Sequence, residues 1–231
     1  MNRVPSSFLD AKKSPTGQIK KLVELKDVTV RFKELQALHK LSFSLHQGDV
    51  VFLTGPTGAG KTTLLRVMAG DQEATSGQVN FQTKKIGKIF QDLRLLEEYT
   101  LEQNLFFAYD AKNYRNKNHF YDQMMEYAAA VGARDILHKK LSEMNGGMKQ
   151  KIAFVRALLT KPDIILADEP TSSLDYQSSK RLFDILNYLN TKEGLTIVWA
   201  THNRELIKNF NGKILHIDKG KFVHMGNACF I

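Results

Sequence analysis

Short apolar runs alternate along this chain with longer amphipathic segments, a pattern that predicts strands and helices in turn. Leu22–Val30 and Leu41–Leu45 alternate between apolar and polar positions, as half-buried strands do. Asp49–Thr54, Ile164–Ala167 and Thr196–Ala200 are instead largely apolar, and each ends at a polar or glycine-rich segment. Runs of this kind are typical of parallel strands that are buried on both faces.

Between these runs the apolar period changes to that of a helix. Lys61–Ala69 follows the first buried run and is closed by a glycine. Further helices are predicted between Thr100 and about Lys140, and over Met148–Leu159. Two apolar helix faces recur at i, i+3, i+4 and i+7, with Met124, Tyr127, Ala128 and Val131 in one and Leu182, Ile185, Leu186 and Leu189 in the other.

Strands that alternate with helices predict an α/β fold with a mostly parallel sheet and function at the carboxyl ends of its strands. Gly77–Phe81 and Ile86–Phe90 predict two further strands, and Lys213–Met225 predicts a hairpin. Residues 1–21 are polar and basic, and we expect a flexible extension ahead of one domain at 22–231.

The composition excludes some classes of protein. Among the 231 residues, no stretch reaches the roughly 20 consecutive apolar residues needed to span a bilayer. The single cysteine, Cys229, excludes an internal disulfide and fits a reducing compartment. The net charge of +9 is compatible with nucleic acid or anionic lipid as a partner. Because the 33 basic residues are scattered, we favour a well-solvated surface, and a lipid-facing surface stays open.

A glycine-rich loop follows the first buried run and opens a helix, which is the context in which such loops bind phosphates. Its glycines let successive N–H groups turn toward phosphate oxygens, and the helix N-terminus adds about half a positive charge. Lys61 is expected to reach the β- and γ-phosphates, and the Thr62 hydroxyl to bind Mg²⁺. The predicted nucleotide-binding loop comprises Gly55, Pro56, Thr57, Gly58, Ala59, Gly60, Lys61, Thr62 and Thr63.

Two adjacent carboxylates, Asp168 and Glu169, end the second buried run. A carboxylate in this place is able to hold Mg²⁺ beside a phosphate loop. Because neighbouring residues of an extended strand point in opposite directions, we expect Asp168 to face the metal. Glu169 would then face the γ-phosphate and polarise the attacking water. A charged strand end is the alternative, and the presence of the phosphate loop favours catalysis.

With these motifs the chain resembles the nucleotide-binding subunits of ABC proteins, from about Leu22 to Met225. The resemblance implies a P-loop NTPase fold of ABC type, with an antiparallel β lobe and a helical subdomain at about 92–147. It also implies Mg²⁺-dependent ATP hydrolysis that uses Lys61, Glu169 and His202. Five further elements match in order. Phe32 stands in the place of the aromatic residue that stacks on adenine, with a core residue as the alternative, and Gln91 in that of a Mg²⁺ contact. Asn145-Gly146-Gly147 matches the signature loop, and Asp175 lies in the loop that crosses to another subunit. His202 matches the switch histidine at the γ-phosphate.

The signature loop departs from the family's usual Leu-Ser-Gly-Gly-Gln, because Met144-Asn145-Gly146-Gly147-Met148 stands in its place. In the family, the serine donates a hydrogen bond to the γ-phosphate bound on the opposite subunit. Asn145 keeps a donor in its amide, whereas Met148 does not replace the polar contact of a glutamine. We therefore expect intact ATP binding and weakened dimer-dependent hydrolysis.

The resemblance further implies a homodimer that encloses two ATP molecules, an integral membrane partner, and no nucleic-acid partner. Four strings are most similar to those of the cell-division ATPase FtsE, whose partner is FtsX: Phe52–Gly60, Ile89–Leu96, Leu166–Thr171 and Ala200–Glu205. An FtsE-like protein would lie at the cytoplasmic face of the inner (plasma) membrane. Its partner would dock in a groove near Gln91. The candidates to line this groove are Phe90, Leu93, Leu95, Leu96 and Tyr99, and buried packing explains some of these residues equally well.

Three alternatives to the FtsE-like role stay open. One is a transporter ATPase for lipoprotein release or macrolide-type export, which shares the chemistry and differs in its partner. Another is an ABC protein that acts on nucleic acid or ribosomes, which is disfavoured because the chain shows neither a second such domain nor a long coiled-coil insertion. The third is a module that senses ATP without hydrolysing it, which the altered signature loop suggests and the intact Asp168, Glu169 and His202 argue against.

Overall fold

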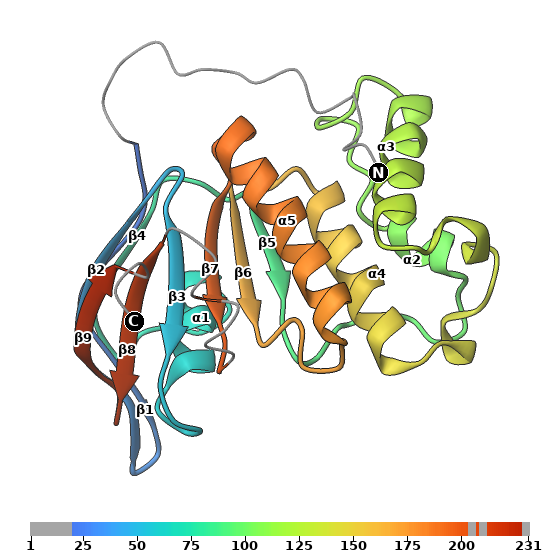
Figure 1. Ribbon diagram of the computed structural model, residues 1–231. Helices are drawn as coiled ribbons and strands as arrows, with labels where there is room; N and C mark the ends of the chain where they lie inside the picture. Colours follow the sequence, from blue (N-terminus) through green and yellow to red (C-terminus); the bar gives the residue numbers. More distant parts are fainter. Residues whose placement is uncertain (1–19, 203–206, 208–211, 228–231) are drawn as a thin grey trace.

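The computed structural model describes residues 20–202, 207 and 212–227, and most of the predicted extension at 1–21 lies outside them. The chain forms two sheets (Figure 1). The smaller sheet is antiparallel, in the order β2-β1-β4, and comprises β1 (Lys21–Phe32), β2 (Leu35–His46) and β4 (Ser76–Phe81). The larger sheet has the order β5-β6-β7-β3-β8-β9 and comprises β3 (Val50–Thr54), β5 (Ile86–Ile89), β6 (Ile164–Asp168), β7 (Thr196–Ala200), β8 (Lys213–Asp218) and β9 (Lys221–Asn227).

Neighbouring strands from β5 to β8 run parallel, and β9 is antiparallel to β8. The predicted α/β class, with a mostly parallel core and an antiparallel lobe, is therefore confirmed. The parallel arrangement brings the carboxyl ends of five strands to one edge of the larger sheet, where ligands of such sheets bind.

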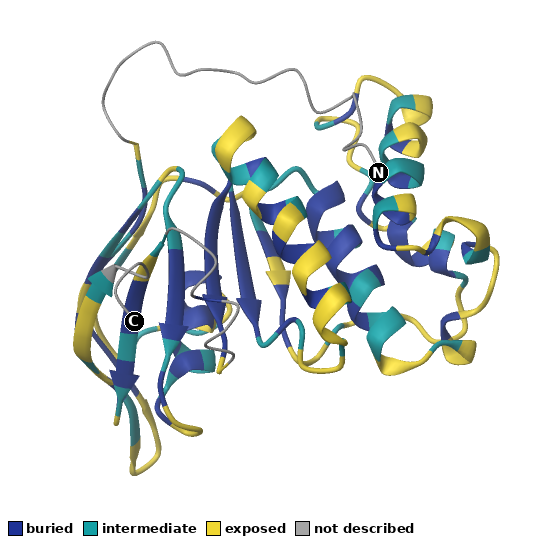
Figure 2. Cartoon of the chain, viewed as in Figure 1, coloured by how far each residue is buried: buried dark blue, intermediate teal, exposed yellow. Residues whose placement is uncertain are grey.

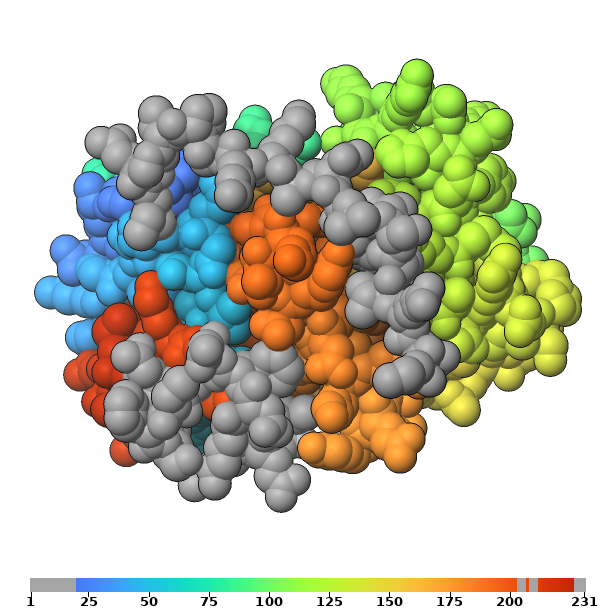
Figure 3. All heavy atoms as spheres, turned by 45° about the horizontal axis from the view of Figure 1, so that its top comes forward, coloured from blue at the N-terminus to red at the C-terminus, as the bar shows by residue number. Residues whose placement is uncertain are grey.

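Three helices pack directly on the larger sheet: α1 (Lys61–Met68), α4 (Gly146–Leu159) and α5 (Tyr176–Glu193). The helical segment beside them comprises α2 (Leu101–Phe106), α3 (Lys117–Ala130), η2 (Arg134–Ile136) and η3 (Leu141–Glu143). Figure 3 shows this segment, in green and yellow, on the opposite side of α5 from the β1–β2 lobe in blue. In the described part of the chain, no helix combines the length and the apolar character needed to cross a membrane.

Strand alternation divides the core into two layers. Val51 and Leu53 of β3 pack toward α1 and the smaller sheet, whereas Phe52 packs on the opposite face with α4 and α5. β6 and β7 alternate in the same way, so both faces of the central strands are buried (Figure 2). This double burial explains why these strands are almost continuously apolar in the sequence.

An aromatic cluster holds the helical segment together and attaches it to α4. Phe120 of α3 is fully buried, and the centroid of its ring lies 4.9 Å from that of Tyr114 and 5.6 Å from that of Phe106. The Tyr114 hydroxyl donates to the Leu159 carbonyl at 2.6 Å, and burial raises the pKa of this tyrosine. The predicted apolar face of α3, which includes Met124, is buried as expected.

Phe120→Ala is expected to destabilise the protein by about 3–5 kcal/mol, because the change leaves a cavity at the centre of the aromatic cluster. The free energy of unfolding in urea, followed by circular dichroism, measures this loss. Tyr121→Ala is the matched control, because Tyr121 is adjacent in α3 but 37% exposed, and its loss should be clearly smaller. Equal losses for the two variants would contradict the prediction.

Candidate functional site

The candidate site lies where β3, β7 and β6 end side by side. Leu53 of β3 and Asp168 of β6 are both in register with Ala200 of β7. The backbone continues this alignment past the strand ends, since Thr201 donates to the Leu53 carbonyl at 3.2 Å and Glu169 donates to the Ala200 carbonyl at 3.0 Å. The segments that follow the three strands therefore start next to one another.

The loop after β3 needs glycine for two physical reasons. Gly55, Gly58 and Gly60 have φ angles of 144°, 79° and 106°, in the left-handed region that other residues rarely adopt. A Cβ atom at Gly55 would lie 2.0 Å from the Ile217 carbonyl oxygen, and one at Gly60 would lie 2.5 Å from that of Ala37. The loop is thus packed tightly against β8 and β2.

The N-terminus of α1 concentrates positive charge and hydrogen-bond donors. Its N-cap, Gly60, provides no side-chain cap, so the first N–H groups of the helix have no side-chain acceptor from that residue. The Lys61 ammonium donates to the carbonyls of Gly55 at 2.8 Å and Pro56 at 3.0 Å, and Lys61 is only 7% exposed. This arrangement suits an anion such as phosphate.

Two of the predicted metal ligands lie in direct contact. The Thr62 hydroxyl donates to Asp168 Oδ2 at 2.5 Å, and Asp168 is 3% exposed. A hydroxyl oxygen and a carboxylate oxygen side by side are the donors that Mg²⁺ prefers. Within the described ranges, no group of three or more His, Cys, Asp or Glu residues is placed to hold a metal ion. A cation at Thr62 and Asp168 would therefore depend on phosphate and water for further ligands. Gln91, the third predicted ligand, is exposed and follows β5, the neighbour of β6.

The second pair in the site joins Glu169 and His202. His202 Nε2 lies 2.7 Å from Glu169 Oε1, and both side chains are partly exposed. Glu169 does not follow the predicted strand alternation, because it lies beyond the last residue of β6 and has a φ of 50°. Left-handed backbone at a residue other than glycine is strained, and such strain clusters at functional sites. The strand end therefore turns at Glu169 instead of continuing the alternation.

The predicted signature loop forms the N-terminus of α4. Asn145 is the N-cap, and its Oδ1 accepts a hydrogen bond from the Met148 N–H at 2.9 Å. This bond uses the amide oxygen and leaves the amide N–H groups of Asn145 to donate elsewhere. Met144 and Met148 are partly buried against the hydrophobic core. The methionines thus serve packing, which explains their apolar character.

The remaining predicted residues lie on other elements. Phe32 ends β1 and is 44% exposed, so it is not a core residue. Asp175 is the N-cap of α5, where its carboxylate accepts from the Ser178 N–H at 2.8 Å and the Ser178 hydroxyl at 2.9 Å. These hydrogen bonds lower the pKa of Asp175. In a single chain the structure therefore assembles Lys61, Thr62, Asp168, Glu169 and His202 at one edge, and it leaves Phe32, Asn145 and Asp175 on separate elements.

Gln150 was given no functional role from the sequence, where it served only to align the signature loop. This side chain is 8% exposed in α4 and is hydrogen-bonded to the loop that follows Glu169. The available signal was its position three and four residues before Ala153 and Phe154, on the buried face of the helix.

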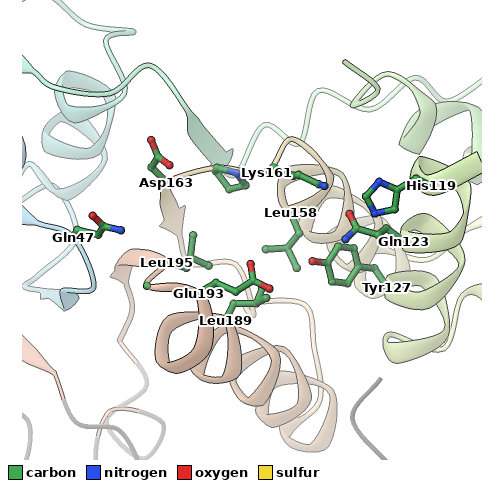
Figure 4. Close-up of a pocket in the computed structure, with 12 residues that line it drawn as sticks. Gln47, His119, Gln123, Tyr127, Leu158, Lys161, Asp163, Leu189, Glu193 and Leu195 are labelled. Carbon is green, nitrogen blue, oxygen red and sulfur yellow. The ribbon is translucent and has the colours of Figure 1, made fainter. Parts of the chain in front are cut away.

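A cavity of about 350 Å³ lies at the opposite edge of the sheet (Figure 4). Gln47, Asp163 and Leu195 line it, and they precede β3, β6 and β7 respectively. The cavity thus lies at the amino ends of these strands, whereas the candidate site lies at their carboxyl ends, so the two are separate. Lys161 and Glu193 give the cavity mixed charge, and burial lowers the pKa of the former and raises that of the latter.

Comparisons with known proteins agree with this geometry. A family model described as ABC transporter matches residues 38–172. The methionine import ATP-binding protein MetN of Lactobacillus johnsonii is 32% identical over 224 residues, which cover 88% of this chain and 64% of that protein. The glutamine transport ATP-binding protein GlnQ of Escherichia coli is 32% identical over 220 residues, which cover 89% of this chain and 91% of that protein. The chain thus spans just under two thirds of MetN and nearly all of GlnQ.

Solved structures give the same result. The dimeric structure of MJ0796, described as a bacterial ABC transporter cassette, matches with a TM-score of 0.80 and 26% identity, over 91% of this chain and all of the other. The same protein in a post-hydrolysis state bound to ADP and Pi matches with a TM-score of 0.78.

Gly55→Ala is expected to destabilise the protein far more than Gly58→Ala. Both changes place a side chain in left-handed backbone, at a cost of about 1–2 kcal/mol. Only at Gly55 would the new Cβ also overlap a backbone carbonyl, since nothing lies within 4 Å of a Cβ at Gly58. Urea unfolding of both variants measures the difference. Equal unfolding free energies would show that the loop moves freely away from β8.

Proposed function

We propose that this chain, which belongs to the ABC transporter family, is an ATPase that binds Mg²⁺-ATP at the loop after β3. It would couple ATP hydrolysis to a membrane partner. The observation that carries the proposal is the alignment of two contacts at one sheet edge, Thr62 with Asp168 and Glu169 with His202. Each contact joins segments that are distant in the sequence.

The residues at this edge suit hydrolysis of a terminal phosphate. Backbone N–H groups of the loop and the Lys61 ammonium would hold the phosphates. Thr62 and Asp168 would hold Mg²⁺, which neutralises charge on the phosphate oxygens. Glu169 would accept a proton from the water that attacks the γ-phosphorus, while the bond to the β-phosphate oxygen breaks and ADP leaves. His202, in contact with Glu169, would keep that carboxylate in place.

A second copy of the chain would complete each site. Asn145 and Asp175 cap the N-termini of α4 and α5, and among the described residues no hydrogen bond joins either of them to the loop at 55–63. Exposed N-terminal ends of helices attract anions. We propose that the Asn145–Gly147 loop acts on ATP that is held by the other subunit. The similar cassette MJ0796 is described as dimeric, which supports a two-subunit arrangement.

The docking surface for a membrane partner would be an apolar hollow on the helical segment. The hollow has a volume of about 350 Å³. Tyr99 and Phe107 are 43% and 59% exposed, and their ring centroids are 5.7 Å apart. A short apolar helix from a membrane protein would fit such a surface. The hollow is lined by Tyr99, Glu102, Gln103, Phe106, Phe107 and Tyr121.

The candidates for the docking groove divide between buried and exposed residues. Phe90 fits the packing alternative, because it is 9% exposed and belongs to the hydrophobic core that contains α1. The physical reason is its place directly after β5, where the side chain packs inward. Leu96 and Tyr99 are 45% and 43% exposed, and Tyr99 lines the hollow together with residues of α2.

Two partners are candidates, each favoured by a different observation. MetN and GlnQ are named as import and transport proteins, which favours a solute permease. The strings at 89–96 and 200–205 favour an FtsX-like protein and a role in cell division. In either case the ATPase would lie at the cytoplasmic face of the inner (plasma) membrane. Purification of the chain from its native membranes, with mass spectrometry of the co-purified protein, distinguishes the two. Recovery of an export permease would contradict both.

Glu169→Gln is expected to slow ATP hydrolysis by roughly 100-fold or more, since it removes the proton acceptor. ATP binding should persist, because Lys61 and the loop N–H groups are unchanged. Size-exclusion chromatography with ATP should then show a stable dimer. Lys61→Ala is the control, and it should bind no ATP and stay monomeric. Full turnover by the Glu169→Gln variant would refute the assigned role.

Asn145→Ser is expected to raise turnover of the assembled complex by roughly two- to tenfold, the effect of one improved hydrogen bond. Serine also caps helices well, so stability should be unchanged. Steady-state ATPase assays with matched unfolding measurements test both expectations. Asn145→Ala, which removes both the cap and the donor, should lower stability by about 1 kcal/mol and also lower turnover. Unchanged turnover in the serine variant would contradict the idea that this loop limits hydrolysis.

A further inference from the structure

One buried side chain bridges two loops that the proposed mechanism uses separately. The Gln150 amide nitrogen donates to the Ser172 hydroxyl at 2.9 Å, and its amide oxygen accepts from the Ser173 N–H at 3.1 Å. Gln150 belongs to α4, whose N-terminus is the Asn145–Gly147 loop. The two serines belong to the loop that follows Glu169. A neutral amide suits this place because it carries a donor and an acceptor at once.

The bridge continues to the catalytic end of β6. The Ser172 N–H donates to the Glu169 carbonyl at 3.1 Å, so a continuous path of hydrogen bonds runs from Glu169 through Ser172 to Gln150. The two loops also touch directly, since a Cβ atom at Gly147 would lie 3.0 Å from the Ser173 carbonyl oxygen. The N-terminus of α4 and the loop after Glu169 are therefore packed and bonded as one unit.

We propose that Gln150 is a positioning residue that couples the two ATP sites of the dimer. This inference rests on the proposed function, in which Glu169 acts on ATP held by its own chain and the Asn145–Gly147 loop acts on ATP held by the neighbour. A shift of the backbone at Glu169 in one site is transmitted through Gln150 to the loop that closes the other site. Contiguous hydrogen-bonded elements of this kind carry energetic coupling between sites.

Gln150→Leu in the full chain tests the proposal, because leucine fills a similar volume and makes neither hydrogen bond. We expect ATP binding to a single chain to be unchanged. Turnover at saturating ATP should fall at least fivefold, and the Hill coefficient for ATP should fall toward 1. Gln123→Leu is the matched control, since it makes the same chemical change on α3, away from both loops. This control should keep wild-type kinetics.

Two more variants separate positioning from a general loss of stability. Gln150→Glu keeps an acceptor for the Ser173 N–H, and the Ser172 hydroxyl is able to donate to its second oxygen, so turnover and cooperativity should partly recover. Ser172→Ala removes one half of the bridge at a loop position. Its effect should not add to that of Gln150→Leu in the double variant, because both changes break the same path.

Hydrogen exchange at the Ser173 amide gives a readout that does not depend on activity. Gln150→Leu should speed this exchange, while the amides of α4 stay protected. If exchange speeds up but turnover and the Hill coefficient stay at wild-type values, the bridge exists and does not couple the sites, and the inference is overturned. Additive effects of Gln150→Leu and Ser172→Ala would also overturn it. Absence of ATP hydrolysis by the wild-type chain would instead refute the proposed function itself.

Discussion

The parallel register of β3, β7 and β6 is the constraint on which the rest of this structure depends. Because Leu53 and Asp168 both pair with Ala200, three strand ends coincide at one sheet edge. The phosphate loop, the acidic strand end and His202 then start beside one another although more than 100 residues separate the first from the second. The contact between Thr62 and Asp168 at 2.5 Å, from different segments, is a direct consequence.

The loop that would hold phosphate is shaped from outside as well as by its own glycines. The carbonyls of Ile217 and Ala37 leave no room for a side chain at Gly55 or Gly60. The Ala59 carbonyl also accepts a hydrogen bond from the Gly220 N–H at 2.9 Å. Since β2 and the β8–β9 turn press on the loop, its N–H groups are held in place before any ligand arrives, and little entropy is lost on binding.

The loop at Asn145 shows how a departure from a family pattern is accommodated. Its side-chain oxygen caps α4, so the substitution preserves the helix end while the amide nitrogens remain available. Met148 gains burial where the family has a polar side chain. The changes favour packing within the chain over polar contact with a neighbour. Gln150, one helical turn away from Gly147 and Gly146, retains a polar link to the loop after Glu169.

Local patterns in the sequence determined the fold class, the buried strands, the main helices and the phosphate loop, because periodicity and glycine spacing act over a few residues. The resemblance to ABC proteins is confirmed by the family match over 38–172, whereas the FtsE-like role stays a proposal. Only the tertiary structure decided the left-handed turn at Glu169, the burial of Phe90 and the bridge made by Gln150. Each of these features depends on a contact or a strand end that only the folded chain defines. The local periodicity of apolar residues in the sequence does not specify it.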